Sequence, residues 1–244
     1  MAKRYVRPVE SRQFLIRRLH SLSGIIPIGF FLFFHIGTNS LIAVSSDEDL
    51  FQKQVDNIHN LGPLLIPVEV LFIFVPLLYH IVVGVKIWSE SKPNSRNYTY
   101  WGNIRYTLQR TTGIATLAFI LVHLYQMHWM GGWLPGGAAF NHEMASKTTA
   151  QVLQAAWWVP PFYAIGVVAA CYHFSNGVWT FLITWGVTIG PRSQRIAGYA
   201  CLALGIGLTF TGLAAVRGFK TFDTKAAEPA PIVHPQAALP PQPQ

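Results

Sequence analysis

The sequence carries little charge for its length. Only 11% of its 244 residues are Asp, Glu, Lys or Arg, whereas soluble domains carry about a quarter. Hydrophobic residues make up 51%, so the composition favours an integral membrane protein. The net charge of +8 could attract an acidic partner or lipid headgroups, but we interpret it as a topology signal, and we expect no nucleic-acid partner.

Cysteine is also scarce. Cys171 and Cys201 are the two present, both inside apolar runs, which argues against a disulfide framework and against a cysteine-based metal site. The chain has no C-x-x-C-H motif, no flavin-binding glycine fingerprint and no cysteine set for an iron–sulfur cluster. The basic N-terminus lacks the short apolar core and cleavage site of a signal peptide, so we expect the first apolar segment to be retained as an anchor.

Long apolar runs, in contrast, are abundant. A bilayer-spanning helix needs about 20 mostly apolar residues, and five stretches qualify: 22–44, 64–85, 113–133, 159–185 and 196–216. Backbone polar groups must be satisfied inside lipid, so these runs should be helices. The expected fold class is an all-α integral membrane protein with five transmembrane helices joined by short links.

Positive charges are distributed unevenly around these runs. Thirteen Lys and Arg residues precede the first run or lie between the second and third or the fourth and fifth, against five on the other side. The chain should therefore lie in the cell membrane with its N-terminus in the cytoplasm and its C-terminus outside. We divide it into a basic cytoplasmic segment at 1–21, a transmembrane domain at 22–219 and a disordered Pro- and Ala-rich tail at 220–244.

The first four apolar runs each contain one deeply placed histidine: His35, His80, His123 and His173. One alone could be a hydrogen-bonded structural residue, but ionisable residues in membrane spans are rare and usually functional. Four, at one per helix, favour two metal centres, each clamped by two opposing imidazoles. Haem with two axial histidines fits, whereas zinc prefers three or four clustered ligands. We expect the first four helices to form a haem-binding bundle.

The depth of these histidines suggests how they pair. Counted from the outer helix ends at 1.5 Å per residue, His35 and His123 lie roughly 14 and 12 Å deep, and His173 and His80 roughly 21 and 24 Å deep. This predicts an outer pair, His35 with His123, and an inner pair, His80 with His173. Counting from the inner ends separates the pairs less cleanly, because His123 and His173 then lie at similar depths.

Two glycines accompany the inner pair. Gly84 and Gly177 follow His80 and His173 by four residues, a spacing that places each on the face of its histidine. A glycine there would let a porphyrin edge approach the backbone, although close helix packing also uses small residues.

The cytoplasmic edge offers candidate partners for an inner haem. Arg17 and Arg110 are placed where propionate carboxylates could reach them, although arginines there can equally face lipid headgroups. His20, in the segment RRLHSLSG, could bind a propionate or a quinone, or could be an ordinary interfacial residue.

One carboxylate stands out. Glu69 lies six residues into the second apolar run, where an acid is costly. We interpret it as a proton carrier for a quinone near the outer haem; a bond to a neighbouring helix is the alternative.

Four segments together resemble a known family. They are FLIRRLHSLSGIIPIGFFLFFH, FIFVPLLYHIVVGV, LQRTTGIATLAFILVH and HFSNGVWTFLITWGVTIGPRSQRI. They look like the dihaem cytochrome b membrane anchor of succinate dehydrogenase and fumarate reductase, most closely its five-helix, single-chain Bacillus type. The resemblance covers roughly 14–219, and the basic N-terminus and Pro-rich tail are additions to the family pattern.

The resemblance implies two haems b, ligated from helices one and three and from helices two and four. The matching positions are the outer pair His35 and His123 and the inner pair His80 and His173. It also implies a flavoprotein that handles succinate and fumarate, an iron–sulfur subunit docked on the cytoplasmic face, and a quinone, usually menaquinone, near the outer haem. This chain would then be the non-dehydrogenase subunit of a succinate:quinone oxidoreductase, serving the respiratory chain and the tricarboxylic acid cycle.

Two other functions stay open at this point. A different dihaem cytochrome b, such as the membrane subunit of a hydrogenase or formate dehydrogenase, also carries histidines on several helices. A haem-free transporter could use the histidines as a proton relay. Haem content would decide between the transporter and the other two, and co-purifying subunits would separate the two cytochromes.

Overall fold

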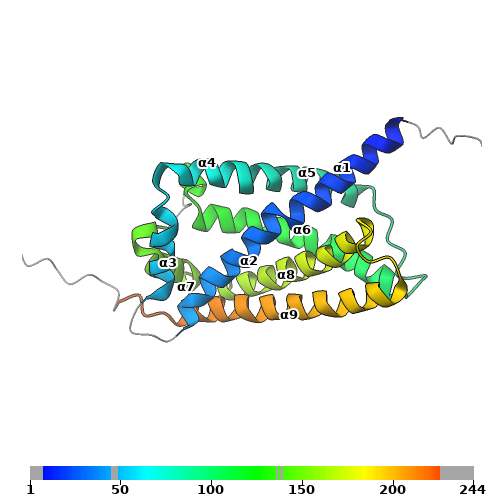
Figure 1. Ribbon diagram of the computed structural model, residues 1–244. Coiled ribbons are helices and arrows are strands. Elements are labelled where there is room, and N and C mark those ends of the chain that lie inside the picture. The colour runs from blue at the N-terminus through cyan, green and yellow to red at the C-terminus, as the bar shows by residue number, and fades with distance from the viewer. Residues whose placement is uncertain (1–7, 45–48, 136, 138–139, 226–244) are drawn as a thin grey trace, which may run out of the picture.

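The computed structural model describes residues 8–44, 49–135, 137 and 140–225. Every regular element in this part of the chain is helical. The long helices run roughly lengthwise in one elongated bundle, and short helices lie across one end of it (Figure 1). The tail expected to be disordered falls mostly at 226–244, outside the described residues.

The first long helix is broken once. α1 (Pro8–Ile25) and α2 (Pro27–Ser40) meet at Ile26, because Pro27 has no N–H to donate into the preceding turn. The amide of Ile26 still donates to the carbonyl of Leu22 at 3.0 Å, so the two helices form one bent rod that crosses the bundle diagonally (Figure 1). α1 runs through the domain boundary expected at residue 21, so the basic segment is helical from Pro8 onward.

The second long segment changes helix type along its length. A short η2 turn (Gly62–Leu64) leads into α4 (Leu65–Glu69), a π-helical stretch η3 (Val70–Phe74) and α5 (Val75–Ser89). Pro76 follows the π-helical stretch and removes one backbone donor. Single π-helical turns within α-helices are rare and are often found at functional sites.

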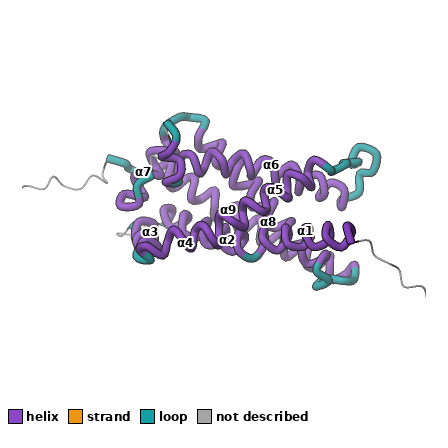
Figure 2. The backbone as a smooth tube through the Cα atoms, turned by 90° about the horizontal axis from the view of Figure 1, so that it is seen from above, coloured by secondary structure: helices purple, strands orange, loops and turns teal. Residues whose placement is uncertain are grey.

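Three further long helices complete the bundle. α6 (Trp101–Met127), α8 (Val159–Thr184) and α9 (Pro191–Thr221) follow in order. α8 lies between α6 and α9 and contacts both. Figure 2 shows the same bundle from above, with the loops gathered at its ends.

The connection between α2 and α4 and the connection between α6 and α8 are longer and contain more regular structure than the short links expected from the sequence. The first contains η1 (Leu41–Ala43) and α3 (Leu50–His59), and the second contains η4 (Trp129–Trp133), η5 (His142–Met144) and α7 (Ala145–Gln154). α3 and α7 bury one face each, in a cluster that includes Phe51, Ala145, Leu153 and Phe219. These amphipathic helices were missed because hydropathy alone finds only fully apolar segments.

Three helical stretches of the described chain are long and apolar enough to cross a membrane: Arg12–Ala43, Gly62–Ser89 and Pro191–Thr221. A fourth qualifies if η5–α7 and α8, which meet at 105°, count as one. α6 is not among them, although its 27 residues would extend about 40 Å. Polar residues such as Arg105, Gln109 and Arg110 lower its hydropathy. The protein is therefore an all-helical, multi-pass membrane protein.

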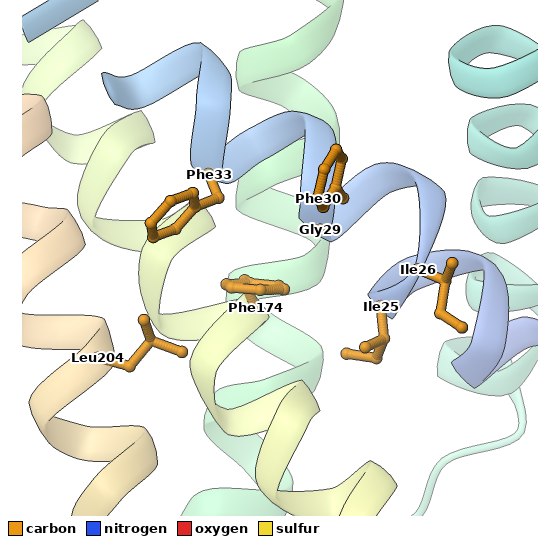
Figure 3. Close-up of a pocket in the computed structure, with 7 residues that line it drawn as sticks. All are labelled: Ile25, Ile26, Gly29, Phe30, Phe33, Phe174 and Leu204. Atoms are coloured by element: carbon orange, nitrogen blue, oxygen red, sulfur yellow. The ribbon is translucent and has the colours of Figure 1, made fainter. Parts of the chain in front are cut away.

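An apolar hollow of about 360 Å³ lies beside the break in the first helix. Phe174 projects from α8 toward Gly29 and Ile25, with Leu204 of α9 below it (Figure 3). A Cβ atom at Gly29 would collide with the Phe174 ring. Gly29 therefore makes room for the ring of Phe174, the residue that follows His173 on α8.

Candidate functional site

The structure brings His80 of α5 and His173 of α8 together. Their ring centroids lie 6.1 Å apart, with the ring planes at 85°. Nδ1 of His80 lies 3.0 Å from the backbone oxygen of His20, and Nδ1 of His173 lies 2.9 Å from the backbone oxygen of Gln109. A carbonyl oxygen can only accept, so each Nδ1 carries the proton and each Nε2 keeps its lone pair.

His20 lies directly against this inner pair. Its ring stacks on His80 with the centroids 4.0 Å apart and the planes at 17°. A Cβ atom at Gly84 would lie 3.2 Å from Cε1 of His20, so Gly84 makes room for the His20 ring. Nδ1 of His20 is buried, with no hydrogen-bond partner among the described residues.

A chain of hydrogen bonds supports His173 from α6 and α8. Nε2 of Gln109 donates to the backbone oxygen of His173 at 3.0 Å, and Nδ2 of Asn176 donates to Oε1 of Gln109 at 2.7 Å. Nε of Arg105 donates to Oδ1 of Asn176 at 2.7 Å, and its guanidinium stacks 3.6 Å from the centre of the Trp179 ring. The position and tautomer of His173 are thus fixed by several side chains acting together.

The structure also brings together His35 of α2 and His123 of α6. Their centroids lie 5.7 Å apart, with the planes at 78°. Phe31 stacks on His35, and Phe119 and Tyr163 pack on His123. Nδ1 of His123 is buried without a hydrogen-bond partner in the described part of the chain. The outer pair is therefore held mainly by aromatic packing, and the inner pair by hydrogen bonds.

Two glycines that the sequence analysis missed accommodate the inner pair. A Cβ atom at Gly24 would lie 2.5 Å from Cε1 of His80, and one at Gly113 would lie 2.9 Å from Cε1 of His173. Real Cβ atoms are almost never found this close to a neighbour. In the sequence, Gly24 follows His20 by four residues, which is the only sign that it shares a face with a histidine. The sequence does not reveal which helix lies opposite each histidine, so neither glycine could be assigned to its partner.

The separations of both pairs suit a metal ion between the rings. A metal held about 2.0–2.1 Å from each of two opposed imidazole nitrogens places the ring centroids roughly 6 Å apart. The observed distances are 5.7 and 6.1 Å. Each pair brings together two imidazoles from different helices, which is the number and kind of ligands that a bis-histidine haem takes. The residues present therefore fit haem.

Glu69 lies opposite His128. Oε2 of Glu69 lies 3.7 Å from Nε2 of His128, and both side chains are largely buried. Glu69 ends α4 just where the π-helical stretch begins, and His128 follows the last residue of α6. The Phe74 ring packs edge-on against His128. This separation is longer than a direct hydrogen bond, so a proton would pass between the two groups through one intervening water or after a small closure of the gap.

The remaining predicted residues have other neighbours. Arg17 forms a 3.3 Å ion pair with Glu90, and both side chains are exposed. Arg110 stacks over Tyr106, and its Nε is buried without a hydrogen-bond partner among the described residues. A Cβ atom at Gly177 would lie 3.5 Å from Nε2 of Gln109, an ordinary packing distance.

A search among known proteins finds a close relative. The chain is 37% identical over 209 residues to the succinate dehydrogenase cytochrome b558 subunit of Bacillus subtilis strain 168. The match covers 86% of this chain and 98% of that protein. No protein-family model matches the chain.

Proposed function

The chain belongs to the family of cytochrome b membrane-anchor subunits of succinate dehydrogenase, and we propose that it binds two haems b and links an iron–sulfur subunit to a membrane quinone. The observation that carries this proposal is the pairwise opposition of four histidines from four helical segments. When bound, haem would supply a one-electron carrier at each pair.

His80 and His173 hold the inner haem in this proposal. Their Nε2 atoms are the ligating nitrogens, since their Nδ1 atoms donate to the carbonyls of His20 and Gln109. A donated Nδ1 proton raises the basicity of the opposite nitrogen and restricts rotation of the ring. His35 and His123 hold the outer haem, with ring orientation set by Phe31 and Phe119.

We propose that the propionates of the inner haem lie near Arg17, Arg110 and His20. Gly84 on α5 and Gly177 on α8 would provide space for the edge of the haem. Arg110 supports this proposal best, because its buried Nε has no hydrogen-bond partner in the described chain and a propionate oxygen would supply an acceptor.

Glu69 is proposed to carry protons for the quinone, which we take to be menaquinone, near the outer haem. His128 lies 3.7 Å away and provides a second proton-binding group. The π-helical turn that follows Glu69 supports this role, since such turns change the direction of side chains within a helix.

The proposed topology has five spans, with α6 and α8 as the third and fourth. Basic residues gather at the end of the bundle where α1 and α9 begin and α5 ends, which favours a cytoplasmic location for that end. The flavoprotein and iron–sulfur subunits would dock there. The chain itself would hold no site for succinate.

Purification of the complex with this chain tests the function. We expect two equivalents of haem per chain, a low-spin bis-histidine spectrum, and co-purification of a flavoprotein and an iron–sulfur protein. Succinate should reduce the haems, and added quinone should reoxidise them. A colourless preparation would exclude this function, and a dihaem protein without a flavoprotein would indicate a different respiratory enzyme.

A further inference from the structure

A cleft of about 670 Å³ runs between α6, α8 and α9, away from both histidine pairs. This volume is typical of a site for one small ligand. Trp101 and Arg105 of α6 line one end together with Arg195 of α9, and Val168 and Phe210 line the other. The cleft is therefore basic and aromatic at one end and apolar at the other.

The cleft opens on a different face of α8 from the one that presents His173. Tyr172 and Trp179 line it, and at 100° per residue they lie about 100° and 120° around the helix from His173, both on the same side. Any occupant would therefore contact the flank of the bundle, where lipid is expected, and would leave the proposed haem face free.

The basic end suits a phosphate group. Arg105 and Arg195 both line it, and no acidic residue is among the described residues that do so. Arg105 uses Nε to bond Asn176 and its flat face to stack on Trp179, which holds the guanidinium in one position. Its terminal NH1 reaches the backbone of α9, where a Cβ atom at Gly198 would lie 3.5 Å away. An arginine fixed in this way can present its remaining N–H groups to an anion.

One polar group beside the cleft lacks a partner among the described residues. The hydroxyl of Tyr172 is buried and has no hydrogen-bond partner in the described chain, and Tyr172 lines the cleft. Unpaired buried hydroxyls are uncommon because their desolvation is costly. A small turn of the Tyr172 ring toward the cleft would let this hydroxyl donate a hydrogen bond to a ligand oxygen.

The length of the cleft matches one leaflet of a bilayer. Arg195 and Phe210 are fifteen residues apart along α9 and both line it, a separation of about 22 Å. A bilayer with its headgroups is about 40–45 Å thick, so one leaflet is roughly 20–22 Å. A headgroup at Arg195 would place an acyl chain alongside Leu202, Ile206 and Phe210.

We propose that this cleft binds one anionic phospholipid, with its phosphate between Arg105 and Arg195 and one acyl chain along α9. Two arginines favour an anionic headgroup over a zwitterionic lipid or an uncharged quinone ring. Binding does not depend on the proposed haems. The assignment of the cleft to the cytoplasmic leaflet does rest on the proposed topology.

Native mass spectrometry of the intact, delipidated complex, titrated with dioleoylphosphatidylglycerol or dioleoylphosphatidylcholine, tests this site. We expect tighter binding of the phosphatidylglycerol. Arg195→Gln should weaken it about fivefold, the effect typical of one basic residue at a membrane surface. Arg192→Gln is the matched control, because Arg192 lies on the same exposed turn of α9 but does not line the cleft. Leu202→Trp, which fills the apolar end, should weaken both lipids.

Haem content measured on the same samples separates this proposal from the function proposed above, since Arg195→Gln should leave it unchanged. Equal affinity for the two lipids would overturn the site, as would equal losses in the Arg195 and Arg192 variants. Displacement of phosphatidylglycerol by menaquinone would show that the cleft is a quinone site instead.

Discussion

Asn176 joins the inner histidine pair to the charged end of the bundle. Its side chain is only 3% exposed, and it accepts from Arg105 while donating to Gln109. Gln109 in turn accepts from Nδ1 of His173 through its backbone oxygen. A residue with no direct contact to the proposed iron can therefore influence how its ligand is held.

Asn176→Leu should break both links while keeping a side chain of similar size. We expect the inner haem to bind about 10–100-fold more weakly and its midpoint potential to shift, while the outer haem keeps its potential. Ser175→Ala is the control, because among the described residues the Ser175 hydroxyl donates only to the backbone oxygen of Tyr172 in its own helix. Equal shifts of both potentials would show that Asn176 acts only through overall stability.

Glu69 and His128 allow a second prediction for single residues. Glu69→Gln keeps the size of the side chain but cannot bind and release a proton. Succinate should still reduce the haems, while quinone reduction falls at least tenfold, since a positioned acid or base commonly contributes about 10²–10⁴-fold. Glu90→Gln is the control, as Glu90 is exposed and pairs with Arg17. Normal quinone turnover in Glu69→Gln would assign Glu69 a structural role.

Single residues were predicted from the sequence to different extents. The four central histidines stand out because ionisable residues are rare in apolar runs. Gly24, Gly113 and the Asn176 network were not predicted, because their roles depend on which helix lies opposite. Asn176 is one residue from Gly177, yet only the packing of α6 against α8 shows what it bonds.

At the scale of elements, α6 illustrates why hydropathy is an incomplete guide. Its polar residues, including Gln109 and His123, contact histidines of neighbouring helices. The apolar runs at 64–85 and 159–185 agree with the observed helices to within four residues at each end, whereas the helical rod that contains 22–44 begins at Pro8. Helix α9 extends further than expected, from Pro191 to Thr221, because amphipathic turns at its ends escape a search for apolar residues.

Close approach of α6 to α8 can be tested at Gly113. A valine there would force atoms against the His173 ring, which lies 2.9 Å from the position of the added Cβ. We expect Gly113→Val to lower haem content from two to about one per chain. Gly102→Val in the same helix is the control, because nothing lies within 4 Å of a Cβ at that position. Retention of both haems in Gly113→Val would indicate that α6 and α8 are further apart than described.

The whole molecule is a bundle with basic residues concentrated at one end. Thirteen of its Lys and Arg residues belong to segments predicted to be cytoplasmic, and five belong to segments predicted to lie outside. Orientation of this kind arises during insertion and is encoded by charge rather than by packing. The sequence therefore predicts orientation directly, whereas the capping of the bundle end by α3 and α7 emerges only from the folded chain.

Reporter fusions test this orientation. Alkaline phosphatase, which is active only outside the cytoplasm, should be active when fused after Lys225 and inactive when fused in the loop between α5 and α6. The reverse pattern of activity would invert the topology and move the proposed docking face for the iron–sulfur subunit to the opposite end of the bundle.

The central claim is that four histidines form two haem sites in the stated pairs, and redox titration of the purified complex tests it most directly. We predict two one-electron waves in the unsubstituted protein. His35→Ala and His123→Ala should each remove the same wave, and His80→Ala and His173→Ala should each remove the other. Loss of the same wave in His35→Ala and His173→Ala, or two intact waves in His173→Ala, would contradict the pairing.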